Sequence, residues 1–410
     1  MNKVKLGDIA DIITGPFGSM LHKSDYVEDG TPVIMPQDIG DRTISFEGIA
    51  RVGIDDAERL SRYATIAEDI VYARRGDVEK HAFITNGQAG ALCGTGCLRV
   101  RIDQRKANPL YVSFALNELS SRGWIRRHAV GSNMPNINTD ILSDLPLDLP
   151  NLEEQRLVAD VLSALDDKIA LNKKMIAELE QTARLIYDYW FMQFDFPDEN
   201  GRPYRSSGGK MVYNETLKRE IPAGWEAGTL GDFASYGERS IANSTLTAGT
   251  YVSTDNMLPD RGGIVDSQYL PELGTSTMFE KRDVLLSNIR PYFKKIWLSD
   301  RVGGCCNDVL VIHPNDDSIW AFLYWTVEND SFFAYDAAGA KGSKMPRGDK
   351  EHIMQYPIPL PPLWISDSFA EKMSPLMVVA GELSGEAAHL SSLRDWLLPM
   401  LMNGQVTVSD

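Results

Sequence analysis

The sequence predicts an α+β fold class: two α/β domains separated by two long antiparallel coiled-coil helices, with a pseudo-twofold internal repeat. Three observations support this prediction. Short motifs recur between the two halves of the chain, two long stretches carry apolar residues at coiled-coil spacing, and a stretch rich in Pro, Gly and Ser separates the halves. The length of 410 residues is enough for several domains, each with its own hydrophobic core.

The internal repeat is visible in four pairs of short segments. Leu-Gly-Asp-Ile-Ala at 6–10 recurs as Leu-Gly-Asp-Phe-Ala at 230–234, and Asp-Ile-Val-Tyr at 69–72 parallels Asp-Val-Leu-Leu at 283–286. Gly-Ser-Asn-Met-Pro at 131–135 recurs as Gly-Ser-Lys-Met-Pro at 342–346, and Pro-Leu-Asp-Leu-Pro at 146–150 as Pro-Ile-Pro-Leu-Pro at 357–361. The last two pairs share an offset of 211 residues. Because the segments at 69–72 and 283–286 are typical of short buried strands, each half is predicted to be a mixed α and β domain.

These repeats and the local composition divide the chain into five parts. We expect a first domain at residues 1–150, a first spacer helix at 151–194, a linker at 195–221, a second domain at 222–362, and a second spacer helix with the C-terminal tail at 363–410. The first helix, counted from Val158 to Trp190, is predicted to be about 48 Å long at ~1.5 Å per residue. With short connections the second helix returns antiparallel, which places the two domains at opposite ends.

The first helix carries an apolar seam at alternating spacings of four and three residues. Its members are Val158, Leu162, Leu165, Ile169, Asn172, Ile176, Leu179, Ala183, Ile186 and Trp190. A period of 3.5 sustained over more than four heptads favours a coiled coil over ordinary core packing, which is the alternative. Asn172 is the polar member of the seam, and it either sets the register of helix pairing or lies at a frayed, solvent-facing position.

The second helix repeats this seam 207 residues later, with two charged interruptions. Its positions are Ile365, Phe369, Lys372, Leu376, Val379, Leu383, Glu386, Leu390, Leu393 and Leu397. Pro375 and the glycines Gly381 and Gly385 predict a kink or a late helix start, because a proline inside a helix removes a hydrogen bond and clashes with the preceding turn.

Composition indicates a folded, soluble protein of the cytoplasm. Hydrophobic residues make up 43% and charged residues 24%, values typical of globular chains, which excludes wholesale disorder. No apolar run of about eighteen residues and no N-terminal signal segment are present, so we expect neither membrane spanning nor secretion. The four cysteines, Cys93, Cys97, Cys305 and Cys306, lack the spacing of a zinc site and are expected to be buried thiols in a reducing compartment.

Charge is distributed unevenly along the chain. The formal net charge of −16 argues against nonspecific nucleic-acid binding, which usually needs a basic surface. Residues 74–131 nevertheless contain ten basic and four acidic side chains, and further basic groups gather at 281–295 and 341–350. Both halves therefore carry basic patches in a chain that is acidic as a whole.

Catalytic motifs are missing from the sequence. No G-x4-G-K-[ST] phosphate loop occurs, and neither the glycine-rich turn nor the Asn/Asp-Pro-Pro-aromatic motif of a DNA methyltransferase is present. Asp166-Asp167-Lys168 matches a nuclease D-x-K pattern, but its place between the seam residues Leu165 and Ile169 favours a solvated helix face. We therefore expect no catalytic residue, no metal site and no cofactor in this chain.

The chain resembles the specificity subunits of type I restriction-modification systems along essentially its whole length. The similarity rests on Leu-Pro-Asn-Leu-Glu-Glu-Gln at 149–155, on the linker from Phe194 through Ser-Ser-Gly-Gly-Lys at 206–210 to Trp225, and on Leu-Pro-Met-Leu-Met-Asn-Gly at 398–404. Pro-Pro-Leu-Trp-Ile at 361–365 departs from the pattern, because it lacks the Glu-Gln pair and four residues of the first helix start. Strict symmetry between the halves is therefore in doubt.

This resemblance implies a non-catalytic DNA reader. Its two target-recognition domains would each read one half of a bipartite site in double-stranded DNA, and the helices would set the gap, at most about 14 base pairs for a spacer of about 48 Å. It also implies two methyltransferase subunits and restriction-translocase subunits as partners. Those partners would bind S-adenosylmethionine, ATP and Mg²⁺, and they would methylate adenine at N6 or cleave DNA.

The candidate DNA contacts are basic side chains chosen by charge, loop context and repeat position, since cations bind phosphates and bidentate donors read base edges. They are Arg74, Arg75, Arg126 and Arg127 in the first domain and Arg290, Lys294, Lys295 and Lys344 in the second. Each could instead form a surface ion pair, and Tyr292 and Phe293, among the second set, could be core residues. The repeated Gly-Ser-x-Met-Pro loops either face DNA or serve as structural turns.

The principal alternative is an acidic DNA mimic, an antirestriction decoy that uses the charge of −16 to occupy a DNA-binding partner. Such a protein needs continuous acidic faces, which the basic clusters interrupt. A self-contained restriction enzyme is disfavoured by the missing catalytic motifs.

Overall fold

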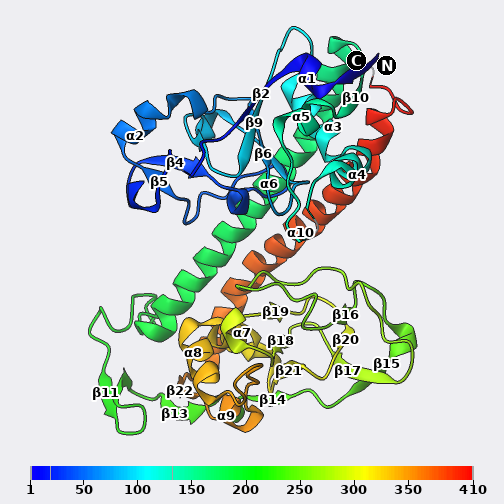
Figure 1. Cartoon of the computed structure of the whole chain (residues 1–410). Helices are drawn as coiled ribbons and strands as arrows, with labels where there is room; N and C mark the ends of the chain where they lie inside the picture. Colours follow the sequence, from blue (N-terminus) through cyan, green and yellow to red (C-terminus); the bar gives the residue numbers. More distant parts are fainter. Residues whose placement is uncertain (1, 19, 132, 409–410) are drawn as a thin grey trace. The chain divides into compact units, whose positions relative to one another are not determined.

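The structure is a computed structural model that describes residues 2–18, 20–131 and 133–408. The chain folds into two compact units, the first comprising Met1–Leu171 and Glu386–Asp410 and the second Asn172–Gly385. Each unit contains sheets, short helices and part of both long helices, so the predicted α+β fold class is confirmed (Figure 1).

The main sheet of the first unit is antiparallel, with the strand order β2-β9-β6-β7. These strands are Ala10–Thr14, Cys97–Ile102, Ile70–Ala73 and His81–Phe83. All four residues of β6 are buried, which explains its unbroken apolar run. A second sheet of order β3-β5-β4-β8 consists of Tyr26–Val27, Arg51–Val52, Thr31–Ile34 and Leu92–Cys93, and β1 (Asn2–Lys5) pairs with β10 (Pro146–Leu149).

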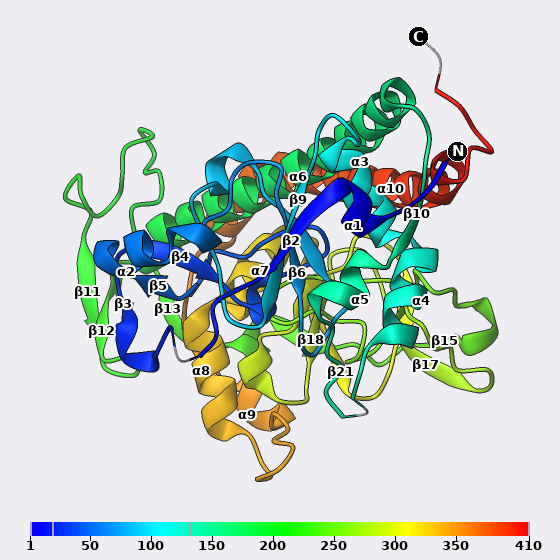
Figure 2. The ribbon, with the colours of Figure 1, turned by 45° about the horizontal axis from the view of Figure 1, so that its top comes forward.

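The short helices of the first unit are α1 (Leu6–Ile9), α2 (Ile54–Arg59), α3 (Pro109–Asn117), α4 (Leu119–His128) and α5 (Thr139–Ser143). Asn108 caps α3, since its Oδ1 accepts a 2.9 Å hydrogen bond from the Tyr111 amide, and Pro109 follows at the first helical position. α3 is buried on nearly all sides, because it packs against both the main sheet and α6 (Leu152–Tyr187), as Figures 1 and 2 show.

The second unit repeats this plan. Its main sheet has the order β14-β21-β18-β19, formed by Ala234–Tyr236, Val309–Pro314, Val284–Ser287 and Ile296–Leu298. A further sheet, β15-β17-β20-β16, consists of Ser240–Ala242, Thr275–Phe279, Gly303–Cys305 and Tyr251–Val252, and β13 (Glu226–Thr229) pairs with β22 (Pro357–Leu360). α7 (Trp320–Glu328), α8 (Asp330–Gly339) and α9 (Lys350–Met354) follow in the order of α3, α4 and α5. The internal repeat is therefore present in the fold.

The two long helices, α6 and α10 (Leu363–Met402), run antiparallel within each unit. In the first unit Asp166 pairs with Arg394 at 2.8 Å and Lys168 pairs with Glu386 at 3.3 Å. In the second unit the Asn172 amide group donates to the Leu383 carbonyl at 3.5 Å. In the first unit the residue numbers of the paired positions rise along α6, from 166 to 168, and fall along α10, from 394 to 386, which is the pattern of an antiparallel pair.

The predicted seam residues of α6 lie on the buried side of that helix, and Val158, Leu162, Ile169 and Asn172 are among the fully buried ones. Leu165, Ile176, Leu179 and Ile186 are half-buried, as are Leu376, Leu383, Leu390, Leu393 and Leu397 on α10. The buried side of α10 differs from the prediction by one residue at three positions: Met373, Ala380 and Ala387 are buried, whereas Lys372, Val379 and Glu386 are exposed. This shift leaves the lysine and the glutamate in water.

α10 is continuous from Leu363 to Met402, so the late start predicted from Pro375 is wrong. Pro375 itself is exposed, while its neighbours Met373 and Leu376 pack against the core of the second unit. Burial of these apolar side chains offsets the hydrogen bond that the proline removes.

The predicted linker at 195–221 is more ordered than its composition indicates. It includes β11 (Met211–Asn214) and most of β12 (Arg219–Pro222), which form an antiparallel hairpin. Phe196 and Ile221 are buried in the core of the second unit, and the Phe196 ring stacks on Trp225 with ring centres 5.3 Å apart. The segment is therefore an integral part of that unit.

Three of the four cysteines, Cys93, Cys97 and Cys305, are buried free thiols, and Cys306 is half-buried. Burial raises the pKa of the Cys93 thiol to about 12, so this group is protonated at neutral pH. None of the helices that the structure describes combines the length and the apolar composition needed to cross a membrane.

Candidate nucleic-acid interface

In each unit a turn and a loop that are distant in sequence lie side by side. In the first unit the turn 74–77 follows β6 and the loop 130–136 follows α4. Val130 and Asn136 exchange two backbone hydrogen bonds of 2.9 Å, and the Ile137 amide donates to the Arg74 carbonyl at 3.0 Å. We call the turn and the loop together the loop pair of this unit. Ser132, in the repeated motif, lies outside the described residues.

The second unit contains an equivalent loop pair, formed by the turn 288–291 after β18 and the loop 341–347 after α8. Lys341 and Arg347 exchange backbone hydrogen bonds of 2.8 and 2.9 Å, and the Gly348 amide donates to the Asn288 carbonyl at 3.0 Å. The loop residues in these bonds stand 211 positions after their counterparts. The repeated sequence motif thus marks a repeated backbone structure.

The glycine that opens both motifs has a structural reason. Gly131 and Gly342 have φ angles of +107° and +101°, a conformation that favours glycine. A Cβ atom at Gly131 would lie 2.7 Å from the carbonyl oxygen of Met134. The glycines are therefore structural, while the side chains of Met134 and Met345 are exposed and accessible to a ligand.

Arg74 and Arg75 occupy the turn of the first loop pair. Arg75 is exposed, and its backbone pairs with Asn136 in a strand-like bridge. Arg74 is half-buried, and its Nε has no hydrogen-bond partner among the described residues. The structure thus brings both predicted residues to the loop 130–136.

Arg126 and Arg127 end α4, directly before the same loop. Arg126 holds the Glu79 carboxylate at 2.5 and 2.8 Å, and this hydrogen bonding lowers the Glu79 pKa. Arg127 is exposed and forms no ion pair with a described residue. Arg126 is therefore partly neutralised, and Arg127 is the more accessible cation.

In the second unit the structure brings Arg290 and Lys344 to the loop pair. The Arg290 amide donates to the Pro346 carbonyl at 2.8 Å, which ties the turn to the loop 341–347. Lys344 is exposed on that loop and has no ion-pair partner among the described residues.

Lys294 and Lys295 lie just beyond the turn and contact protein groups. Lys294 pairs with Asp330 at 2.7 Å, and the Lys295 ammonium group donates to the Thr254 carbonyl at 2.6 Å. Hydrogen bonds from Arg261 and Lys294 lower the pKa of Asp330 to about 2. Both lysines are therefore less accessible to a ligand than Lys344.

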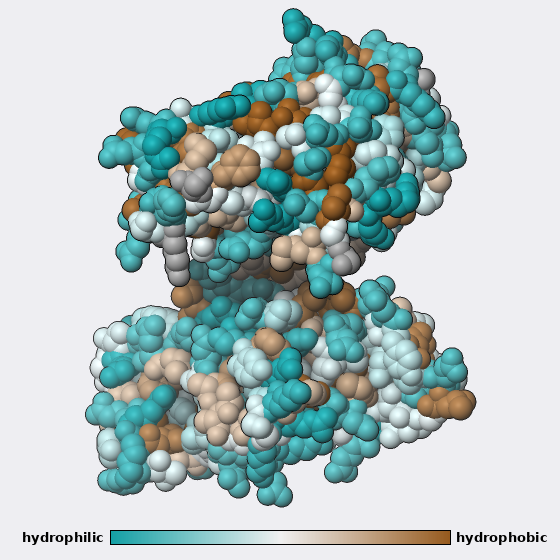
Figure 3. All heavy atoms as spheres, in the orientation of Figure 1, coloured by the Kyte–Doolittle hydropathy of each residue, from teal (hydrophilic) through white to brown (hydrophobic). Residues whose placement is uncertain are grey.

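Much of the positive charge in residues 74–131 is neutralised within the first unit. Arg101 pairs with Asp69 at 2.7 Å, and the buried Arg99 lies 3.2 Å from Asp11. Figure 3 shows that hydrophilic residues cover most of the face drawn, with apolar residues scattered among them. The accessible cations at the loop pair are thus a small subset of the basic residues in the sequence.

A buried carboxyl group lies beneath the second loop pair. Asp336 of α8 is fully buried, neither of its oxygens has a hydrogen-bond partner among the described residues, and burial raises its pKa to about 6. Its Oδ1 and that of Asn288 lie 2.5 and 2.8 Å from the position of a Cβ atom built at Gly348. At the equivalent positions of the first unit, 211 residues earlier, the buried Ile125 replaces Asp336 and the buried Ile137 replaces Gly348. No sequence signal marks this carboxyl group.

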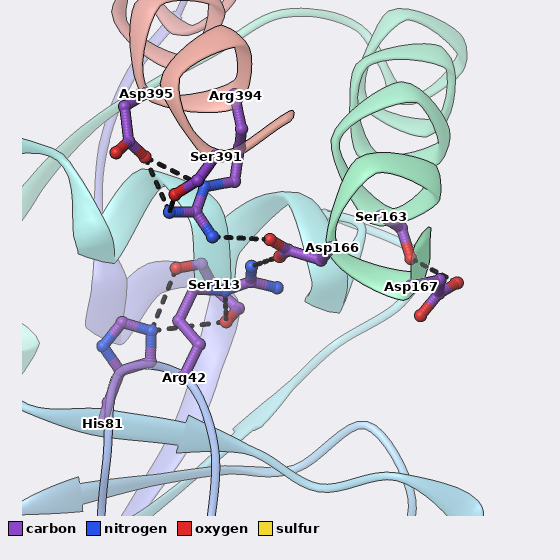
Figure 4. Close-up of polar contacts among 9 residues, drawn as sticks. All are labelled: Arg42, His81, Ser113, Ser163, Asp166, Asp167, Ser391, Arg394 and Asp395. Carbon is purple, nitrogen blue, oxygen red and sulfur yellow. Dashed lines mark hydrogen bonds and ion pairs between the residues drawn. The ribbon is translucent and has the colours of Figure 1, made fainter. Parts of the chain in front are cut away.

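An ion-paired cluster of the first unit joins a loop to both long helices (Figure 4). Arg42 has a φ angle of +56° and a side chain that is only 12% exposed. Its guanidinium group lies 3.5 Å from the centre of the Phe114 ring, its Nε donates to Ser113 Oγ at 3.1 Å, and it pairs with Asp166 of α6. We call Arg42, Asp166 and Arg394 the arginine clamp.

Asp166 bridges two arginines, because it also pairs with Arg394 of α10 at 2.8 Å. The prediction of a solvated helix face is therefore wrong for Asp166. It holds for the neighbouring Asp167, which is exposed and lies 3.5 Å from Ser163 (Figure 4). The D-x-K pattern thus contains a structural anchor, which the sequence pattern alone did not reveal.

The second unit has a related arginine, also in a left-handed backbone conformation. Arg261 has a φ angle of +63°, lies 5.3 Å from the centre of the Phe333 ring and pairs with the buried Glu328 at 3.0 Å. Arg184 of α6 pairs with the same carboxylate. In both units an arginine above an aromatic ring thus connects a loop to an acid, which is half-buried in the first unit (Asp166) and buried in the second (Glu328).

The contact between His81 and Ser113 is not accessible to a substrate. His81 Nε2 lies 3.0 Å from the Ser113 carbonyl oxygen, but both residues are fully buried, and burial lowers the His81 pKa to about 3. In the described part of the chain, no group of three or more His, Cys, Asp and Glu side chains is placed to hold a metal ion. What the loop pairs offer is a binding surface with exposed cations.

Comparisons with known proteins show what the chain resembles. A family model described as the type I restriction modification DNA specificity domain matches residues 1–181. The type I restriction enzyme MjaIX specificity subunit of Methanocaldococcus jannaschii is 24% identical over 321 residues, which cover 73% of this chain and 69% of the relative. The MjaX specificity subunit of the same organism, whose own assignment is provisional, is 22% identical, and the alignment covers 98% of this chain and 93% of the relative.

A solved structure has the same fold. The crystal structure of the type I restriction-modification S subunit from M. genitalium matches with a TM-score of 0.59 at 16% identity, over 98% of this chain and 96% of that one. The chain is therefore similar to type I restriction-modification specificity subunits in sequence and has the fold of one of them.

One of the sequence signatures, at residues 149–155, has a direct structural role. Asn151 caps α6 by accepting a 2.9 Å hydrogen bond from the Glu154 amide. The buried Gln155 accepts a hydrogen bond from the Asn108 amide at 2.8 Å and donates to the Pro150 carbonyl at 2.9 Å. The signature therefore connects the start of α6 to the start of α3.

Proposed function

We propose that this chain is a DNA specificity subunit that reads a bipartite site in double-stranded DNA, with one half-site at each loop pair. The supporting observation is that the two loop pairs share a backbone but differ in side chains. Arg75 in the first corresponds to Ile289 in the second, and Asn136 corresponds to Arg347. Equal scaffolds with unequal side chains suit two half-sites of different sequence.

The side chains at the loop pairs are of the kinds that bind DNA. Arginine reads guanine and asparagine reads adenine through paired hydrogen bonds in the major groove, and cations bind phosphates. Arg75 and Arg127 are exposed in the first unit, and Lys344 is exposed in the second. Exposed cations at both loop pairs also count against the acidic decoy, which needs continuous acidic faces.

We further propose that α6 and α10 set the gap between the half-sites, since each helix begins in one unit and ends in the other. The subunit would present the DNA to two methyltransferase subunits, which bind S-adenosylmethionine, and to restriction-translocase subunits, which use ATP and Mg²⁺. Similarity to type I restriction enzyme specificity subunits supports this assembly, which would act on DNA in the cytoplasm.

Adenine-methylation mapping by long-read sequencing tests the proposal. A host strain that carries the matching methyltransferase subunit is compared with and without this chain. We expect methylation of a two-part motif with a fixed gap only when the chain is present. Unchanged methylation would refute the proposal and favour the decoy.

Variants of the first loop pair test which residues read the DNA. Arg75→Ala and Arg127→Ala should each weaken binding, by about 1–3 kcal/mol where the residue reads a base. Loss of a base contact should relax one position of one half-site, whereas loss of a phosphate contact should weaken all sites alike. Arg105→Ala is the matched control, because this arginine is also exposed but lies outside the loop pair, just after the C-terminal end of β9, where it pairs with Asp103. Equal effects of all three variants would contradict the assignment.

A further inference from the structure

The turn between β18 and β19 has a strained backbone. Arg290 and Lys294, on either side of residues 291–293, have φ angles of +52° and +49°, a region that residues with side chains rarely adopt. In the corresponding turn of the first unit Gly76 has a φ angle of +78° and forms the same backbone hydrogen bond to the adjacent loop. Glycine adopts this conformation without strain, so an arginine at 290 indicates that its side chain is needed.

The strained turn is anchored on both sides. The Arg290 amide donates to the Pro346 carbonyl at 2.8 Å, and the Phe293 carbonyl accepts a 2.8 Å hydrogen bond from the Asp260 amide. Pro291, between them, is buried. These anchors hold the turn in one conformation, so the side chains that it exposes are preorganised for a partner.

Two aromatic side chains project from this turn into solvent. Tyr292 is 53% exposed and Phe293 is 38% exposed, and their rings meet edge to face with centres 4.8 Å apart. The Arg290 guanidinium group lies 5.9 Å from the centre of the Phe293 ring. The alternative that these aromatics are core residues is therefore wrong. Exposed rings on a strained, anchored turn indicate a binding partner.

The surface beside the rings is apolar and basic. On the adjoining loop 341–347, Met345 is 49% exposed, and Lys344 next to it is exposed. DNA suits such a surface, because its bases offer flat apolar faces to aromatic rings and its phosphates attract cations. The corresponding turn of the first unit, Gly-Asp-Val-Glu-Lys at 76–80, has two carboxylates and no aromatic residue.

We propose that Tyr292 and Phe293 form a wedge that enters the base stack at the half-site read by the second unit. This inference rests on the proposed function. The rings separate two stacked base pairs, as apolar side chains do in proteins that kink a duplex, while Arg290 and Lys344 hold the neighbouring phosphates. Because the corresponding turn of the first unit, residues 76–80, has no aromatic residue, one half-site is read partly through its deformability and the other through contacts.

Permanganate oxidation of unstacked thymines tests the wedge on the assembled specificity and methyltransferase complex. The duplex carries the motif found by methylation mapping, with A·T pairs at its unread gap and flanking positions. We expect the wild-type complex to expose thymines in or beside one half-site only, apart from those opposite the methylated adenines. Tyr292→Ala/Phe293→Ala should abolish this reactivity and weaken binding about tenfold.

Two further variants separate the wedge from a general loss of folding. Tyr269→Ala removes another exposed ring of the second unit, 70% exposed, and should change neither the reactivity nor the affinity. Arg290→Gly removes the side chain from the strained position, so it should preserve or raise thermal stability while weakening binding. Both are measured beside the double variant.

The outcomes distinguish the wedge from the proposed function. Thymines that stay unreactive throughout the bound wild-type site would overturn the wedge while directed methylation still supports the DNA reader. Reactivity that survives Tyr292→Ala/Phe293→Ala would also overturn the wedge alone. Absence of a methylated motif with the wild-type chain would overturn both.

Discussion

Replacing Asp166 by alanine tests the arginine clamp of the first unit. The side chains of Arg42 and Arg394 are 12% and 24% exposed, and Asp166 is the carboxylate that lies between them. Without it, two half-buried or buried guanidinium groups repel each other. Arg394 keeps its 2.7 Å contact with Asp395, so Arg42 is the charge that loses its partner.

The expected cost follows from the burial of Arg42. Breaking a buried ion pair by removing one partner typically costs about 3–5 kcal/mol, because the remaining charge is uncompensated. The contact of Arg42 with the Phe114 ring persists, which places the cost near the lower end, about 3 kcal/mol. In a unit of this size, that loss corresponds to a decrease in melting temperature of roughly 6–12 °C.

Thermal unfolding of the full chain, followed by circular dichroism, measures this effect. Asp167→Ala is the matched control, since Asp167 is the next residue on the same helix and is exposed. It should change the free energy of unfolding by no more than about 0.5 kcal/mol. Arg42→Met/Asp166→Ala should be more stable than Asp166→Ala alone, because the double variant leaves no stranded charge at position 42.

Two results would refute this reasoning. Equal melting temperatures of Asp166→Ala and Asp167→Ala would show that the bridging carboxylate contributes nothing beyond a surface charge. A double variant that is no more stable than Asp166→Ala would show that the loss does not arise from the stranded Arg42.

Three other predictions follow from the geometry. Gly131→Ala should lower the melting temperature more than Gly342→Ala. Both variants place an alanine in a left-handed conformation, at a cost of about 1–2 kcal/mol, but the new Cβ atom lies 2.7 Å from the nearest carbonyl oxygen at 131 and 3.4 Å from it at 342. Asp336 should lower the free energy of unfolding by about 3 kcal/mol as the pH rises from 4 to 6, because the carboxyl group ionises near pH 3.8 in the unfolded chain but only at about 6 when it is buried. Asp336→Asn should flatten this part of the pH profile of stability, measured by urea denaturation. Adding seven residues to both α6 and α10, after Leu171 and after Gly385, preserves the heptad and should widen the methylated gap by about three base pairs, and an unchanged gap in methylation mapping would exclude a spacer role.

The repeated motifs predicted the backbone well, because backbone constraints leave a local mark in the sequence. A left-handed position selects glycine at 131 and 342, and the same motif therefore recurs with the same hydrogen bonds. The heptad spacing of α6 likewise indicated which of its side chains are buried, such as Leu162 and Ile169.

Side-chain partnerships could not be predicted, because they depend on segments that meet only in the folded chain. Asp166 and Asp167 are the same residue type at consecutive positions, yet only Asp166 faces Arg42 and α10. Arg126 and Arg127 differ in the same way, since Glu79 reaches only the former. Adjacent helical residues point about 100° apart, and no local pattern states which one meets a partner.

The register of α10 shows a different limit. The prediction carried the α6 seam forward by a constant offset, which assumes that both helices start alike, but the second helix start lacks the Glu-Gln pair. The burial of Met373, Ala380 and Ala387 in place of Lys372 and Glu386 follows from hydrophobicity alone. The shift is visible in the sequence, because the charged Lys372 and Glu386 each stand beside an apolar residue, Met373 and Ala387, that suits the buried side better.

The acidic composition and the basic loop pairs are complementary requirements of a selective DNA reader. Phosphate attraction supplies most nonspecific affinity, so a uniformly basic protein binds DNA of any sequence. A net charge of −16 opposes that binding, while screening at physiological salt limits each charge to about 8 Å. In the proposed function, Arg75, Arg127 and Lys344 would therefore attract DNA only when a loop pair is already close to it. Affinity would then depend on the contacts that the loop pairs make with a matching half-site, which is the property that a specificity subunit needs.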